Sequence, residues 1–357
     1  MSSAQVQQLL AKALEERMAG RIEAAIATLD QVLIVDPRNF LALLSKGALL
    51  DKKGKEKGAA HWYRRALANA PPSEVLPANL AQPMARARQA VAAENERVAE
   101  HLSAAVADVR ERFASEDLER FDESLAIFAG KSQVQSQRPL LLHYPRLPAI
   151  PFYDRALFPW LETLEAAAGD VAQEARAAQE TRFDRYAPYI DYPPGAPVDQ
   201  WAELNHNPKW STLFLWRDGV KQNEACAFCP RTTALLERLP LAQQPGFAPT
   251  VVFSVLDAHT SIPPHTGSTN TRLLCHLPLI LPGPARFRVG NVIRDWSLGQ
   301  AWVFDDTIEH EAWNDADLRR TILIFDIWNP FLSEAERALV SAMLAASKAY
   351  GEADEAR

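Results

Sequence analysis

VVFSVLDA at residues 251–258 and TILIFDIW at residues 321–328 decide the fold of this chain. Both segments are rich in Val, Ile, Leu and Phe, which favour β-strands. Further apolar segments lie between them, separated by Pro, Gly and Asp-Asp, at residues 272–281, 286–289 and 301–305. Short strands punctuated by turn residues predict an antiparallel barrel or jelly roll, in which closure removes the sheet edges and the mouth forms a ligand cavity.

Two histidines in this region occur in patterns that indicate a metal. His265 lies in PHTG at residues 264–267, and His310 lies in EHE at residues 309–311. Two histidines on neighbouring strands of such a barrel form half of a non-haem iron site, which in most iron oxygenases also has a carboxylate two residues after the first histidine. Gly267 occupies that position here and cannot ligate. Either the site lacks its third protein ligand, or it is not a metal site.

Other polar side chains are expected to point into the cavity, where a plain core would avoid them: Ser254, Arg272, His276 and Arg320. Arg320 stands beside apolar residues, and a buried arginine is costly unless it meets an anion. Two imidazoles with a buried arginine suit Fe(II) and a dicarboxylate co-substrate. The structural alternative is an ion pair of Arg320 with Asp305, Asp306 or Glu309. Asp305 and Asp306 are expected to close a turn that orders the loop before His310, as acceptors for imidazole N–H groups.

These motifs resemble the aspartyl/asparaginyl β-hydroxylase family of Fe(II)- and 2-oxoglutarate-dependent oxygenases. The resemblance covers about residues 135–335 and rests on motifs in a fixed order: HTG at 265–267, TRLLCHL at 271–277, DDTIEHEAW at 305–313 and FDIWNP at 325–330. It implies a double-stranded β-helix (jelly-roll) domain in which His265 and His310 hold Fe(II) without a carboxylate.

The same resemblance implies that 2-oxoglutarate is held by Ser254, His276 and Arg320. Arg320 would bind the distal carboxylate, and we count it with His265 and His310 as a catalytic residue. Arg272 would orient either the co-substrate or the substrate. Leu274 departs from the animal members of the family, which carry a second arginine at that position, and this difference leaves the substrate open.

The implied activity is a dioxygenase that hydroxylates an aliphatic carbon, with the protein supplying position and electrostatics. The substrate expected first is the β-carbon of an Asp or Asn residue in a peptide or protein. A free or carrier-bound amino acid and a fatty-acyl chain are the alternatives. A different class of function also remains open, in which a non-catalytic repeat scaffold carries a barrel that binds a carboxylate.

Residues 1–130 are expected to form a separate helical domain ahead of the oxygenase domain at residues 131–357, so the fold class is α+β. Five positions recur after 34 residues: Ala13, Gly20, Ala25, Leu29 and Pro37 become Gly47, Gly54, Ala59, Tyr63 and Pro71. This period resembles the tetratricopeptide repeat and predicts helices at residues 4–19, 22–35, 40–53 and 57–69.

Two such repeats cannot stand alone, so residues 73–128, with a long helix near 82–113, are expected to cap them. The repeat module serves either to bind a protein partner or to pack and dimerise. In the second domain, amphipathic helices are predicted within residues 154–179 and at 333–346, the latter capped by Ser333 with Glu336. The turn-rich loop at residues 186–198 is expected to border the cavity.

Cys226 and Cys229 form a C-x-x-C pair, for which we weigh a zinc site, a reversible disulfide and two reduced thiols. A structural zinc site needs four ligands, and the remaining cysteine, Cys275, lies beside His276, so reduced thiols are favoured. Three cysteines in 357 residues are typical of a reducing compartment.

Composition excludes several function classes. A net charge of −7 without a basic stripe argues against nucleic acid as a partner. No apolar run approaches the ~18 residues of a membrane span, and the first five residues lack the pattern of a signal peptide. We therefore expect a cytoplasmic protein that acts on a peptide, protein or small molecule, without a membrane.

Overall fold

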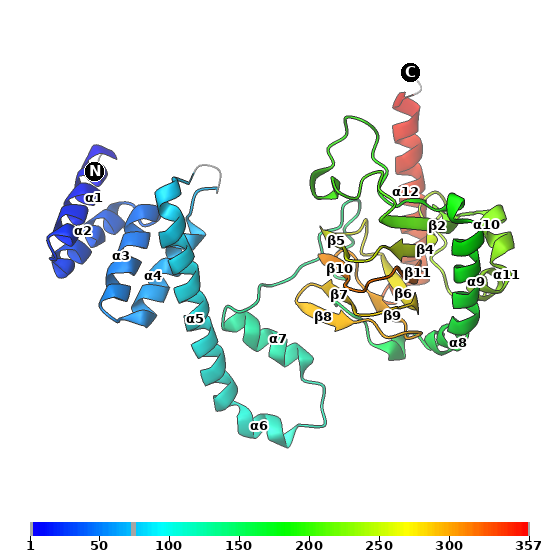
Figure 1. Ribbon diagram of the computed structural model, residues 1–357, viewed down its shortest axis with the longest axis horizontal. Helices are drawn as coiled ribbons and strands as arrows, with labels where there is room; N and C mark the ends of the chain where they lie inside the picture. The colour runs from blue at the N-terminus through cyan, green and yellow to red at the C-terminus, as the bar shows by residue number, and fades with distance from the viewer. Residues whose placement is uncertain (1–2, 73–75, 356–357) are drawn as a thin grey trace. The chain divides into compact units, whose positions relative to one another are not determined.

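The computed structural model describes residues 3–72 and 76–355, and the chain divides into two compact units, Met1–Val134 and Gln135–Arg357 (Figure 1). The predicted domain boundary at residues 130 and 131 falls close to this division. In the described part of the chain, every helix is too short or too polar to span a bilayer.

The first unit is built from helix pairs. Helices α1 (Ser3–Met18) and α2 (Ile22–Val35) pack together, as do α3 (Phe40–Lys52) and α4 (Glu56–Ala68). These bounds agree with the predicted ones to within a residue at each end. The predicted start of the capping segment at Ser73 lies outside the described residues. The segment continues through η2 (Ala78–Leu80), α5 (Ala81–Ala105), α6 (Ala107–Arg112) and α7 (Glu119–Phe128), so the long helix expected near 82–113 is broken at Val106.

Residues related by the 34-residue period occupy equivalent places in the two helix pairs. Gly20 and Gly54 both follow the first helix of a pair with positive φ angles of 74° and 69°, which glycine adopts without strain. Ala25 and Ala59 are buried, as are Leu29 and Tyr63. This equivalence supports a structural repeat, and its assignment to the tetratricopeptide class stays a prediction.

Gly47 and Tyr63 should be energetically coupled, because a Cβ at position 47 would lie 2.5 Å from the Tyr63 ring. We expect Gly47→Ala to cost more stability with Tyr63 present than with Tyr63→Leu, a pair that the first repeat already carries as Ala13 and Leu29. Helix propensity favours alanine by about 1 kcal/mol in both backgrounds and cancels. A double-mutant cycle from urea unfolding, followed by circular dichroism, should give a coupling of about 0.5–3 kcal/mol. Additive effects would contradict the contact.

The second unit contains two antiparallel sheets. The larger has the order β1-β2-β4-β11-β6-β9, with β3 paired to β2. Its strands are β1 (Ala187–Pro188), β2 (Trp210–Arg217), β3 (Val220–Lys221), β4 (Val251–Leu256), β6 (Arg272–Ile280), β9 (Trp302–Phe304) and β11 (Arg320–Trp328). The smaller has the order β5-β10-β7-β8, with β5 (Thr260–His265), β7 (Ala285–Val289), β8 (Val292–Asp295) and β10 (His310–Asn314).

From β4 to β11 the chain passes repeatedly between the two sheets, and this arrangement is the predicted jelly roll. The α+β fold class is therefore confirmed. The five predicted strands correspond to β4, β6, β7, β9 and β11.

Helices cover one face of the larger sheet, and the smaller sheet covers the other (Figure 1). On the helical side, α8 (Leu161–Ala166) and α9 (Ala168–Thr181) bury Leu164 and Val171 in the same apolar cluster as Phe253 and Leu323 of the sheet. The short helices α10 (Asn223–Phe228) and α11 (Pro230–Leu236) extend this layer, with η3 (Arg155–Leu157) and η4 (Phe183–Arg185) at its ends. The apolar side chains between the two sheets form a second cluster, beside the cavity described below.

The last helix, α12 (Glu334–Glu355), begins with the predicted cap. The Ser333 hydroxyl accepts a hydrogen bond from the Glu336 backbone N–H at 3.3 Å, and the Glu336 carboxylate accepts one from the Ser333 backbone N–H at 2.8 Å. This reciprocal pair satisfies two backbone donors at the helix start. The helix runs further than the predicted end at residue 346.

Candidate functional site

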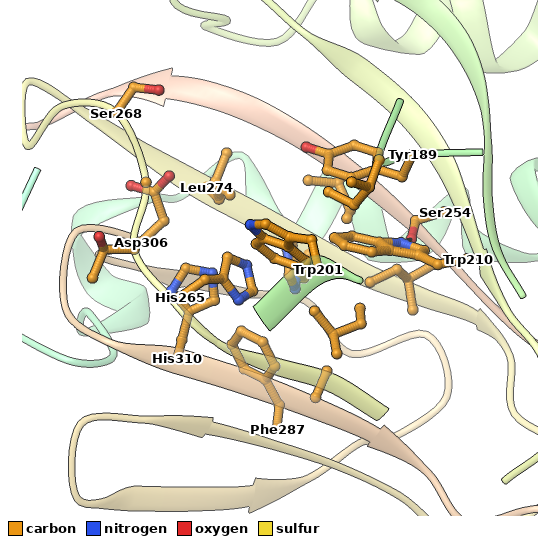
Figure 2. Close-up of a pocket in the computed structure, with 18 of the residues that line it drawn as sticks. Tyr189, Trp201, Trp210, Ser254, His265, Ser268, Leu274, Phe287, Asp306 and His310 are labelled. Carbon is orange, nitrogen blue, oxygen red and sulfur yellow. Dashed lines mark hydrogen bonds between the residues drawn. The ribbon is translucent and has the colours of Figure 1, made fainter. Parts of the chain in front are cut away.

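A cavity of about 240 Å³ lies between the two sheets of the second unit (Figure 2). Its walls are mostly aromatic and aliphatic, from Tyr189, Ile190, Trp201, Trp210, Ile262, Leu274, Phe287, Ala312, Ile322 and Ile324. Its polar side chains are Ser254, His265, Thr266, Ser268, His276, Asp306, His310 and Arg320. The structure thus brings together every predicted site residue except Arg272.

His265 and His310 lie next to each other because their strands pair. β5 and β10 are antiparallel neighbours, and His265 is directly opposite His310 in the register. The two ring centroids are 4.0 Å apart, and the ring planes meet at 53°. Figure 2 shows the two rings beside each other.

A backbone carbonyl two residues earlier in the chain holds each ring. His265 Nδ1 lies 2.8 Å from the Pro263 carbonyl oxygen, and His310 Nδ1 lies 3.1 Å from that of Ile308. A carbonyl only accepts hydrogen bonds, so Nδ1 carries the proton in both rings and the lone pair is at Nε2. Burial lowers the pKa of His265 and holds that of His310 well below its usual range. Two neutral imidazoles with free Nε2 lone pairs are the form that binds a metal.

Asp306 takes the space that a side chain at position 267 would need. A Cβ built on Gly267 would overlap the Asp306 carboxylate, and the Gly267 N–H donates to the Asp306 backbone carbonyl at 2.6 Å. From the sequence, Asp306 was expected only to close a turn, and its position in the cavity was missed. The one sequence feature that could have indicated it is Gly267, which leaves room for another side chain two residues after His265. Even so, within the described residues no group of three or more His, Cys, Asp or Glu side chains is arranged to hold a metal ion.

Arg320 is a buried cation without a counter-charge among the described residues. Its side chain is 1% exposed, and its Nε and Nη1 atoms have no hydrogen-bond partner among the described residues. Burial alone lowers the pKa of Arg320 to about 9. The predicted alternative, an ion pair with Asp305, Asp306 or Glu309, does not occur between the described side chains. A buried cation of this kind costs several kcal/mol unless an anion completes the site.

Ser254 and His276 lie on the strands at either side of β11. Ser254 on β4 is opposite Ile322, and His276 on β6 is opposite Ile324. Ser254 Oγ accepts a hydrogen bond from Trp210 Nε1 at 3.0 Å. Both ring nitrogens of His276 are buried without a partner, and burial together with the Arg320 charge holds the pKa of His276 well below its usual range. These side chains leave polar atoms available to a ligand.

Arg272 does not line the cavity. One of its Nη atoms donates to the Phe247 carbonyl at 2.9 Å and lies 3.5 Å from an Asp326 oxygen. Arg272 starts β6 opposite Trp328 and thus lies at the strand end, beyond the cavity-lining Leu274 and His276. The expectation that Arg272 faces the same cavity is therefore corrected: its guanidinium is engaged by Asp326 and Phe247.

The loop at residues 186–198 and the cysteine pair lie outside the polar centre. Tyr189 and Ile190 of the loop at residues 186–198 line the cavity, as expected. Trp201, from η5 (Asp199–Trp201), also lines it, and its ring packs edge-on to His265 at 5.0 Å. Cys226 and Cys229 are free and buried, and burial raises the pKa of Cys229 to about 12, so both thiols are in the protonated form.

Arg320→Met should raise the melting temperature of the ligand-free protein, because an apolar chain of similar length replaces an unpaired buried charge. The same change should abolish the gain in melting temperature that succinate gives the wild type. Arg319→Met is the matched control, since Arg319 is exposed and its bond to Asp257 is worth about 0–1 kcal/mol. Thermal denaturation of the three proteins with and without succinate measures both effects. An equal succinate response in Arg320→Met would contradict the anion site.

Comparisons with known proteins point to one family. The sequence model of the family described as aspartyl/asparaginyl beta-hydroxylase matches residues 165–330. The aspartyl/asparaginyl beta-hydroxylase of Mus musculus is 32% identical over 187 residues, which are 52% of this chain and 25% of that protein. The aspartate beta-hydroxylase domain-containing protein 2 of Homo sapiens is 29% identical over 211 residues, 58% of this chain and 54% of that protein.

A bacterial relative is named for the hydroxylation of an acyl group. The ornithine lipid ester-linked acyl 2-hydroxylase of Rhizobium tropici is 32% identical over 199 residues, 55% of this chain and 66% of that protein. The chain therefore spans a quarter of the mouse relative and about two thirds of the Rhizobium one. The matched region holds every polar residue that lines the cavity.

Proposed function

We propose that this chain, whose residues 165–330 match the aspartyl/asparaginyl β-hydroxylase family, belongs to that family and is an Fe(II)- and 2-oxoglutarate-dependent hydroxylase. One observation carries the proposal: a cavity that contains two neutral imidazoles side by side and a buried arginine without a counter-charge. Either feature alone has structural explanations. Together they match a metal with an anionic co-substrate.

Fe(II) would be held by His265 and His310 through their Nε2 atoms. The donor set fits the ion, because both rings are neutral, both Nδ1 atoms are fixed by carbonyls, and imidazole suits iron. Since Gly267 offers no ligand, the Asp306 carboxyl group beside it, whose pKa burial raises well above its usual range, would form hydrogen bonds with water at the site.

The co-substrate would be held by Arg320, with Ser254 and His276 beside it. A carboxylate at the free guanidinium atoms would form a charge-assisted hydrogen bond and remove the cost of burying Arg320. Trp210 fixes the Ser254 hydroxyl as an acceptor for its indole N–H, so the Ser254 proton is available to a carboxylate oxygen. Fe(II) and 2-oxoglutarate, when bound, would supply the oxidant that replaces a hydrogen on an aliphatic carbon by hydroxyl.

The first candidate substrate is the β-carbon of an Asp or Asn residue in a peptide or protein, in line with the names of the mouse and human relatives. An acyl chain is the second, because the Rhizobium relative is named for acyl hydroxylation and the cavity wall is largely apolar. The helical first unit would recruit a protein partner or substrate. A groove of about 490 Å³ in that unit, lined by Leu10, Leu14, Leu41 and Leu80 among others, supports this part of the proposal.

Anaerobic titration of Fe(II) into the protein with 2-oxoglutarate should produce a visible charge-transfer band. His310→Ala should abolish the band and weaken iron binding, because a single imidazole remains. His259→Ala is the control: His259 is exposed, bonds Asp317 at 2.9 Å and lies outside the cavity lining, so the band should persist. A wild-type protein that binds 2-oxoglutarate without any band would favour a carboxylate-binding scaffold over the enzyme.

A further inference from the structure

The charges in the cavity restrict the kind of group that can approach the two histidines. Among the described residues that line it, Arg320 is the one lysine or arginine. The proposed function assigns Arg320 to the co-substrate, and this inference rests on that assignment. Asp306 is a carboxyl group and cannot neutralise a second carboxylate.

Leu274 lies far from Arg320 along the larger sheet. On β11, Arg320 is followed by the lining residues Ile322 and Ile324, and Leu274 of β6 is opposite Asp326. Six residues along a strand correspond to about 20 Å. In Figure 2, Leu274, Ser268 and Asp306 lie on one side of His265 and His310, with Ser254 and Trp210 on the other. The side that contains Leu274 is therefore the one left for a substrate.

Among the described residues, Arg272 lies close enough for its charge to act on Asp306, but its guanidinium already faces an acidic partner. Arg272, which starts β6, is held by Asp326 and the Phe247 carbonyl and does not line the cavity. Tyr189, Ile190 and Trp201, which also line the cavity, carry no charge. An anion placed among such groups would lose its hydration without gaining a counter-charge, which is costly.

We infer that the substrate group entering beside His265 and His310 is uncharged, and that Leu274 is the residue that excludes an anionic one. An asparagine-like amide meets this condition, whereas an aspartate side chain does not. Ser268 and Asp306 offer hydrogen-bonding groups to an amide, and Leu274 offers apolar contact.

The test uses the full chain, loaded anaerobically with Fe(II) and 2-oxoglutarate, and two probes that differ by one charge: N-acetyl-asparagine amide and N-acetyl-aspartate amide. Binding is followed by the change that each probe causes in the charge-transfer band. In the wild type we expect the asparagine probe to bind at least tenfold more tightly. Leu274→Arg should reverse this preference, and Leu274→Met, which changes shape little and adds no charge, should retain it.

Tighter or equal binding of the aspartate probe to the wild type would overturn the inference, as would a Leu274→Arg protein that gains no affinity for it. If neither probe changes the charge-transfer band at saturating concentration, the inference is also overturned, because a site that accepts an uncharged group should bind the neutral probe. Failure of the band itself to form would instead refute the proposed function on which the inference rests.

Discussion

The antiparallel pairing of β5 with β10 is the constraint on which the site depends. It places His265 opposite His310, and a shift of one residue would turn one of the rings to the other face of the sheet. The pairing itself is held by the position of β10 between β5 and β7. The jelly roll therefore forms the cavity and also positions the two histidines, because the register of β5 and β10 brings together residues that are 45 positions apart in the chain.

Much of the larger sheet could be predicted from the sequence, because β4 and β11 are central strands that are mostly apolar and buried on both faces. The two strands that carry the histidines were not predicted. β5 contains Pro263 and Pro264, which lack backbone donors and normally indicate a break. They are tolerated because β5 is the edge strand of the smaller sheet. β10 begins with the polar residues His310 and Glu311, and it is too short for its alternation of buried and partly buried residues to be recognised in the sequence.

Within the candidate site, Arg272 is the predicted residue whose direction the sequence did not indicate, although His265, His310 and Arg320 also lie at strand ends and do line the cavity. His276 and Ser254 lie in strand interiors, and their neighbours fix which way they point. Arg272 starts its strand, where an acidic partner from another strand, Asp326, determines its direction. The position of Asp306 could not be predicted from local sequence patterns. Its carboxyl group lies beside Gly267, which belongs to a distant segment of the chain.

The carbonyl contacts of the two imidazoles have a consequence for how the centre is loaded. Both rings keep their proton on Nδ1, which donates to a backbone carbonyl, and burial lowers the pKa of both below the usual value, which favours the neutral form. Uptake of a divalent ion would then displace no proton from either ring. Occupancy would follow the free concentration of the ion in the surroundings and would be largely indifferent to acidity near neutrality.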